Sequence, residues 1–245
     1  GLSAEEAAAA GMTAKMFNSF VDGTKSAIEM AAVANACDLT PAPNGLEFPP
    51  CSIDELADVL RPKSAGGVLH HKGQVEVISS LQRDGGDVTR DLRWGVFVSF
   101  EAPSDYVERC FKEYGISTDS TGRYSALYRP FHLIGLELGV SVISAGLLGQ
   151  PTGVATGFRG DVAATAKRDL AAGEMLDGEG GYCVYGKLIP AADSLKRGYL
   201  PIGLASGVKL KTAIAAGQPV RFADVDIDEK SPAVAFRRAM EAEFS

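Results

Sequence analysis

The chain has 245 residues, of which 46% are hydrophobic, and its formal net charge is −7. This length and apolar content allow one large globular, soluble domain or one domain with a small appendage. The acidic balance argues against nucleic acid or an anionic membrane as the main partner, because both require clustered Lys and Arg.

The N-terminal residues favour helix. Ser3 and Glu6 have the spacing of a capping box, and the run from Met16 to Ala34 is predicted to form one long helix. Its apolar side is opposite a polar stripe of Asn18, Asp22, Lys25 and Glu29.

Residues three and four apart are neighbours on a helix, so this polar stripe suits proton transfer, hydroxyl binding or metal ligation. An ordinary solvated face with weak ion pairs is the alternative. Gly23 lies within the run and costs about 1 kcal/mol relative to Ala in a helix. A purely solvated face does not need that glycine, whereas a helix approached closely by a ligand does.

The next segments are shorter. Residues 38–50 are proline-rich and are predicted to be an irregular loop, and 52–60 to contain a short helix that ends before Pro62. From Gly66 to about residue 102 we expect extended segments in an antiparallel sheet. Residues 104–114 are predicted to form an amphipathic helix.

A polar loop is expected at 117–132, directly before an apolar run at 133–149. Tyr128, Arg129 and His132 lie in this loop, where half of a binding site could form. Arg129 needs an anionic partner from protein or ligand, whereas a lone His132 is more often structural. His70 and His71 are adjacent and are taken as structural, because neighbours on a strand face opposite sides.

The apolar run 133–149 is shorter than the roughly 20 residues that a membrane span requires, so a buried core helix is expected there. No signal peptide is visible, which favours the cytoplasm. The four cysteines form no CxxC pair and no zinc spacing, and they are expected to be reduced, buried thiols: Cys37, Cys51, Cys110 and Cys183.

From about Lys167 short apolar pieces alternate with glycine-containing turns, and a closing amphipathic helix follows at 231–245. The segments Arg168–Glu174, Leu200–Leu204, Val208–Leu210 and Ala216–Pro219 resemble in order and spacing the SAF domain, a compact β-clip fold. A fold of this kind does not by itself identify the chemistry.

Together with the stretches 20–30 (FVDGTKSAIEM) and 128–137 (YRPFHLIGLE), the chain resembles the catalytic and SAF parts of homoserine-dehydrogenase-like oxidoreductases, in the branch similar to 1-deoxy-D-xylulose 5-phosphate reductoisomerase of isoprenoid precursor synthesis. The resemblance implies an α+β fold, with long helices on a sheet in a catalytic and dimerisation domain at 1–165. A SAF-like β-clip domain at 166–230 and a C-terminal helix at 231–245 follow.

The resemblance also implies hydride transfer from NADPH to a small phosphorylated or polyhydroxylated carbonyl compound, in a homo-oligomer. It suggests Lys25, Asp22 and His132 as catalytic residues, and Asp22 and Glu29 as ligands of Mg²⁺ or Mn²⁺. The suggested substrate-binding residues are Asn18, Ser19, Thr24, Tyr128 and Arg129.

In such proteins a Rossmann domain binds NADPH, but no GxGxxG follows a strand in these 245 residues. We therefore expect that NADPH is bound mainly by a domain outside this chain, and that these residues alone do not catalyse hydride transfer. Two alternatives stay open, namely homoserine-dehydrogenase-type oxidation of an amino acid, and a non-enzymatic sugar-binding or oligomerisation module.

Overall fold

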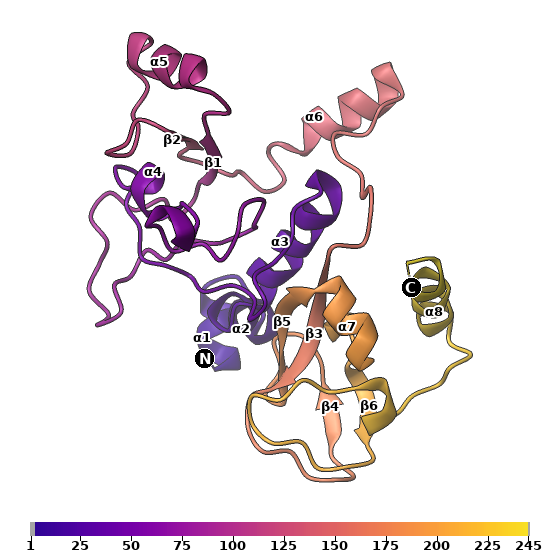
Figure 1. The fold of residues 1–245 in the computed structure, drawn as a ribbon. Helices are drawn as coiled ribbons and strands as arrows, with labels where there is room; N and C mark the ends of the chain where they lie inside the picture. Colours follow the sequence, from indigo (N-terminus) through magenta and orange to yellow (C-terminus); the bar gives the residue numbers. More distant parts are fainter. Residues whose placement is uncertain (1–2, 245) are drawn as a thin grey trace. The chain divides into compact units, whose positions relative to one another are not determined.

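The computed structural model describes residues 3–244, which form two compact units. The first unit combines the N-terminal segment up to Leu46 with the segment from Ala155 onward, and the second consists of Glu47–Val154. Helices and antiparallel strand pairs occur in both units, so the α+β class is confirmed. Each unit is described by itself (Figure 1).

The first unit begins with three helices, α1 (Ala4–Ala9), α2 (Ala14–Val21) and α3 (Thr24–Cys37). The predicted capping box between Ser3 and Glu6 is confirmed. The prediction of one helix from Met16 to Ala34 is wrong, because the helix is broken at Asp22 and Gly23. Gly23 has φ +81°, a left-handed conformation that glycine adopts without the steric cost of a Cβ atom.

Two small sheets follow in this unit. Strands β3 (Gly160–Ala166) and β5 (Val184–Pro190) form an antiparallel pair, and β4 (Met175–Asp177), β6 (Ser206–Leu210) and β7 (Val225–Asp226) form a three-stranded antiparallel sheet. Strand β3 is buried along its whole length. The remaining elements are α7 (Ala191–Arg197), the 3₁₀ turns Ile202–Leu204 and Phe222–Asp224, and the closing helix α8 (Pro232–Glu243).

Helix α3 packs on β3 and β5. The backbone N–H of Gly186 in β5 donates to Thr24 Oγ1 at 2.8 Å, and a Cβ atom at Gly186 would lie 2.9 Å from Thr24 Cγ2. The start of α3 is thus fixed on the sheet, and this contact positions Asp22, two residues before Thr24, relative to β3.

The second unit contains α4 (Leu56–Val59), a 3₁₀ turn (Lys63–Ala65), β1 (Val96–Glu101), α5 (Asp105–Glu113) and β2 (Tyr124–Arg129). The predicted amphipathic helix at 104–114 is confirmed by α5. Strands β1 and β2 are antiparallel, with Val98 opposite Leu127. One face of this pair packs Phe97 and Ala126 onto a buried cluster of Cys51, Leu56 and Leu60.

The structure differs from the predictions at two places around the strands of this unit. Residues 124–129 form strand β2 rather than a loop. The stretch from Val68 to Leu81 contains isolated bridges but no named strand. Its backbone is held by scattered backbone hydrogen bonds, such as that from the N–H of Ser79 to the carbonyl of Pro49 at 2.9 Å, and by side chains. The buried carboxylate of Glu76 accepts from the backbone N–H of Glu47 at 3.1 Å and of Val77 at 2.9 Å.

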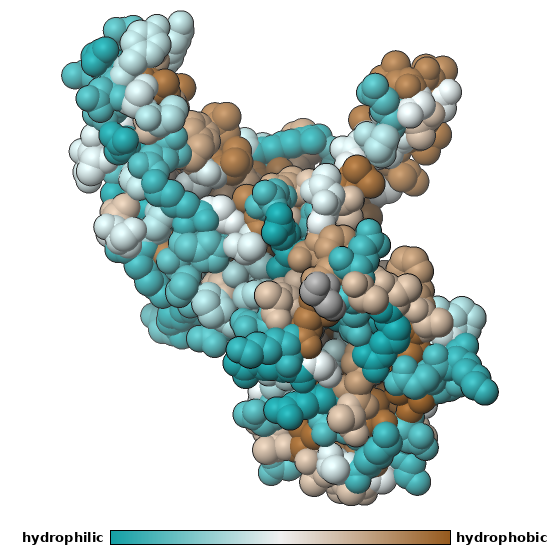
Figure 2. All heavy atoms as spheres, turned by 45° about the vertical axis from the view of Figure 1, so that its right-hand side comes forward, coloured by the Kyte–Doolittle hydropathy of each residue, from teal (hydrophilic) through white to brown (hydrophobic). Residues whose placement is uncertain are grey.

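The apolar run 133–149 is not a buried helix. It forms a short helix, α6 (Leu138–Ile143), and one π-helical turn (Ser144–Leu148), and none of these residues is buried. Figure 2 shows hydrophobic atoms across this segment. Among residues 3–244, no helix has both the length and the apolar content needed to cross a bilayer.

The cysteines are all free, but their burial differs from the expectation: Cys51 and Cys183 are buried, Cys110 is half-buried and Cys37 is exposed.

Candidate functional site

An open cavity of about 620 Å³ lies in the first unit, between the C-terminal end of α2, the end of β3 and the segment that joins β4 to β5. Its polar lining comes from both chain segments of this unit and includes Asn18, Asp22, Lys167, Gly181, Tyr182 and Tyr185. Two of these residues, Asn18 and Asp22, belong to the polar stripe singled out in the sequence.

An ion pair lies in the wall of this cavity. Asp22 Oδ2 is 2.6 Å from Lys167 Nζ, and the two side chains are 15% and 23% exposed. The contact is electrostatic rather than an aligned hydrogen bond, since Asp22 Oδ2 has no hydrogen-bond partner among the described residues. The other oxygen, Oδ1, accepts from the N–H of Thr24 at 2.9 Å, and Lys167 Nζ donates to the carbonyl of Gly181 at 2.6 Å.

The break in the helix explains how Asp22 comes to lie here. Asp22 is the C-terminal cap of α2, and the left-handed Gly23 turns the chain so that α3 can start on the sheet. In a continuous helix Asp22 would follow the helical face that carries Lys25 and Glu29. The break instead allows its carboxylate to contact Lys167.

Tyr185 lies near this ion pair. Burial raises the pKa of the Tyr185 phenol, and the negative charge of Asp22 raises it further. Tyr185 therefore keeps its proton well into the alkaline range and can act as a hydrogen-bond donor in the cavity.

Asn18 supplies an acceptor. Its Nδ2 donates to the carbonyl of Gly180 at 3.4 Å, which fixes the orientation of the amide. Its Oδ1 is buried and has no partner among residues 3–244. Because a buried polar atom without a partner is costly, this oxygen is suited to a hydroxyl or amine donor from a ligand.

The segment from Asp177 to Cys183 contributes Gly180, Gly181 and Tyr182 to the cavity wall and is bonded to α2. Lys15 Nζ donates to the carbonyl of Asp177 at 2.8 Å, and Ser19 Oγ donates to Glu179 Oε1 at 2.6 Å. A Cβ atom at Gly180 would lie 2.0 Å from the carbonyl oxygen of Lys15. This close approach requires glycine and holds the cavity wall against α2.

The other residues expected from the α2–α3 region have contacts of their own. Lys25 Nζ is 2.6 Å from Glu29 Oε1 and lies 5.1 Å from the centre of the Phe20 ring. Ser19 and Thr24 are buried and make the contacts with Glu179 and Gly186 described above. Neither Lys25 nor Glu29 is among the residues that line the cavity.

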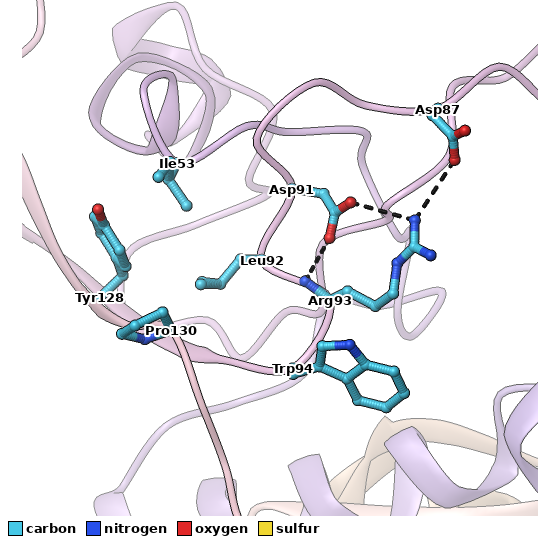
Figure 3. Close-up of a pocket in the computed structure, with 8 residues that line it drawn as sticks. All are labelled: Ile53, Asp87, Asp91, Leu92, Arg93, Trp94, Tyr128 and Pro130. Atoms are coloured by element: carbon cyan, nitrogen blue, oxygen red, sulfur yellow. Dashed lines mark hydrogen bonds and ion pairs between the residues drawn. The ribbon is translucent and has the colours of Figure 1, made fainter.

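Tyr128, Arg129 and His132 belong to the second unit. Arg129 pairs with Glu137, whose other oxygen is 3.6 Å from His132 Nδ1. Hydrogen bonding from the N–H of Leu133, with the charge of Arg129, lowers the pKa of Glu137. The anionic partner that Arg129 requires is therefore protein. Tyr128 lines a separate cavity, shown in Figure 3.

Residues 2–138, more than half of the chain, match the family described as oxidoreductase DRL, catalytic domain. The chain belongs to this family. Residues 162–226 match the SAF domain, so the SAF resemblance is confirmed. A search of curated proteins found no match.

Residues from both matched regions of this DRL protein thus line the cavity. Asn18 and Asp22 lie in the region that matches the DRL catalytic domain, while Lys167 and Tyr185 lie in the region that matches the SAF domain. Sequence reasoning missed Lys167 and Tyr185, because their closeness to Asp22 arises only from tertiary packing. The sequence contained one indication of this residue: Lys167 directly follows the run of small residues Ala163–Ala166.

The residues expected to bind a divalent metal do not fit one well. Asp22 is paired with Lys167 and Glu29 with Lys25. Over residues 3–244, no group of three or more His, Cys, Asp or Glu side chains is arranged for a metal ion. A hard cation such as Mg²⁺ needs several oxygen ligands, and Asp22 and Glu29, each paired with a lysine, do not provide such a set.

Proposed function

We propose that this DRL oxidoreductase reduces a small polyhydroxylated carbonyl compound, and that the carbonyl oxygen of the substrate is bound beside Lys167. The family match supports oxidoreductase chemistry. The observation that carries the choice of site is the half-buried Asp22–Lys167 ion pair in the wall of a cavity large enough for a small ligand.

Reduction of a carbonyl places negative charge on its oxygen, and that oxygen then takes up a proton. An ammonium group beside the oxygen stabilises the charge and can donate the proton. Asp22 holds the ammonium group of Lys167 in the cavity wall. Tyr185, which keeps its proton, is a second donor in the same cavity.

The polar lining favours a substrate with hydroxyl groups. The unpartnered Oδ1 of Asn18 is an acceptor for a substrate hydroxyl. A phosphate would need a cation that is not already neutralised, whereas Lys167 is paired with Asp22 and donates to Gly181. Of the two substrate classes expected from the sequence, the polyhydroxylated one is therefore preferred to the phosphorylated one.

We propose a nicotinamide, NADPH, as the source of hydride. The described strand pairs are antiparallel, and they form no parallel βαβ unit with a glycine-rich turn of the kind that binds dinucleotides. The described residues, 3–244, do not fit that cofactor, so their proposed roles are limited to binding the substrate and moving a proton at its oxygen.

The proposal does not extend to the rearrangement catalysed by 1-deoxy-D-xylulose 5-phosphate reductoisomerase. A metal-assisted rearrangement of a phosphorylated substrate needs several oxygen ligands and a cation for the phosphate, and the cavity residues offer neither a set of carboxylates nor an unpaired cation. Activity that survives EDTA would agree with simple carbonyl reduction.

The test is NADPH oxidation by the full-length protein with hydroxyaldehydes and hydroxyketones, each with and without a phosphate group. Asp22→Asn should lower kcat/KM by about 100-fold, the scale of lost proton-transfer catalysis. Asp226→Asn, at an exposed aspartate in β7, should leave kcat/KM within about twofold. Equal activities of the two variants would refute the proposed site.

A further inference from the structure

A second open cavity, of about 520 Å³, lies in the second unit, between the segment 87–94 and the end of β2 (Figure 3). Its floor is apolar and includes Ile53, the buried Leu92 and Pro130. None of the cavity's residues takes part in the site proposed above.

Backbone contacts hold in place the segment 87–94, which carries the polar wall of this cavity. The N–H of Ile53 donates to the carbonyl of Arg90 at 3.1 Å, and the N–H of Gly95 donates to the carbonyl of Leu92 at 3.0 Å. A Cβ atom at Gly95 would lie 2.3 Å from the carbonyl oxygen of Arg129. The backbone of residues 92–95 is therefore packed tightly against the end of β2.

Arg93 is oriented by two carboxylates. Its Nη2 lies 3.2 Å from Asp91 Oδ2 and 3.5 Å from Asp87 Oδ1, and Asp91 Oδ1 accepts from the N–H of Arg93 at 2.7 Å. Both of these side-chain contacts use Nη2. Within the described part of the chain, no hydrogen bond occupies the Nε or Nη1 donors of Arg93, so they are available to a ligand.

Two aromatic side chains complete the lining. The indole of Trp94 is 75% exposed and Tyr128 is 44% exposed, although a large aromatic surface normally gains stability by burial. Neither the indole N–H nor the Tyr128 hydroxyl forms a hydrogen bond with any residue from 3 to 244. The cavity thus combines an apolar floor, an aromatic surface and several unused hydrogen-bonding groups.

The charges of the polar wall limit the class of ligand that this cavity can bind. Asp87 and Asp91 carry two negative charges against the single positive charge of Arg93, so the polar wall is net negative. This net charge repels phosphates and carboxylates, and both aspartates already contact the guanidinium of Arg93 instead of being free to hold a cation. A neutral ligand with hydroxyl groups on an apolar ring fits best, because its C–H face can pack on an indole while its hydroxyls reach donors and acceptors at the edge.

We propose that this cavity binds a neutral sugar ring of the pyranoside class, packed on Trp94 and hydrogen-bonded by Arg93, Asp87 and Tyr128. Trp94 is the only tryptophan in the chain, so its indole N–H gives a single NMR signal that reports directly on the cavity.

The experiment is a titration of the ¹⁵N-labelled chain with methyl β-D-glucopyranoside and methyl β-D-xylopyranoside, with glycerol at matched concentrations as the control for co-solvent effects. We expect a saturable shift of the indole signal with at least one pyranoside and none with glycerol. If both pyranosides give only the linear drift seen with glycerol, the proposal is overturned.

Two variants and one anionic probe complete the test. Tyr128→Phe, which removes one hydrogen bond, should weaken binding by about 3- to 10-fold, whereas Tyr106→Phe, at an exposed tyrosine outside the cavity, should not change it. Glucose 6-phosphate should bind more weakly than the methyl glucoside. Tighter binding of the phosphate, or equal loss in the two tyrosine variants, would contradict the assignment.

Discussion

Helix α8 is joined to strand β3 by a buried ion pair, and its removal should destabilise the protein strongly. Arg237 and Asp161 are 9% and 6% exposed, and Arg237 donates to both carboxylate oxygens, at 3.0 and 2.6 Å. Asp161 also accepts from Ser194 Oγ at 2.5 Å and from the N–H of Val162 at 3.0 Å. In Arg237→Leu the carboxylate would keep only these two bonds.

Breaking a buried pair from one side costs about 3–5 kcal/mol, because an uncompensated charge is left in the interior. Three kcal/mol corresponds to more than a 100-fold change in an equilibrium constant. We therefore expect the amides of β3, which contains Asp161, to exchange with solvent deuterium at least about 100-fold faster in Arg237→Leu.

The matched control is the neighbouring Arg238→Leu. Arg238 is 39% exposed and pairs with Glu229 at 3.2 Å and Glu241 at 2.8 Å, and such surface pairs contribute about 0–1 kcal/mol. An acceleration below about tenfold in Arg237→Leu, or equal effects of the two variants, would refute the reasoning.

Three further predictions concern titratable groups. Because the charge of Asp22 adds to burial in raising the pKa of Tyr185, Asp22→Asn should lower that pKa in an ultraviolet titration; no change would refute the coupling. Burial raises the pKa of Glu76 despite its hydrogen bonds, so the Glu76 carboxyl binds its proton more tightly in the folded state than in the unfolded state. The stability that this protonation contributes is present at low pH and is lost as pH rises through the folded pKa. Glu76→Gln should therefore lose less unfolding free energy than the parent between pH 4 and 7 in urea titrations. Burial raises the pKa of Cys51 to about 12, so iodoacetamide at pH 8 should label the exposed Cys37 first, as peptide mass spectrometry would show; faster labelling of Cys51 would contradict its burial.

Local sequence signals predicted much of the fold. The amphipathic pattern of α5, the capping box of α1 and the SAF segments are short-range features, and the structure contains each of them. The failures depended on longer-range packing. Gly23 signalled an unusual position, but its left-handed φ and the resulting break follow from the docking of Thr24 on Gly186, which is remote in sequence.

Only part of the candidate site could be predicted from the sequence, for the same reason. Asn18 and Asp22 could be selected from helical spacing, but Lys167 lies 145 positions after Asp22 and meets it only in the folded unit. Lys25 and Glu29 satisfied the same spacing argument and turned out to pair with each other. Spacing on one helix identifies possible partners, whereas packing selects among them.

The most direct test of the central claim compares the two lysines in one assay. We expect Lys167→Met to lower kcat/KM for NADPH-dependent carbonyl reduction by the full-length protein about 100-fold or more, while Lys25→Met, outside the cavity, stays within about threefold of the parent. A large loss in Lys25→Met with an active Lys167→Met would contradict the claim.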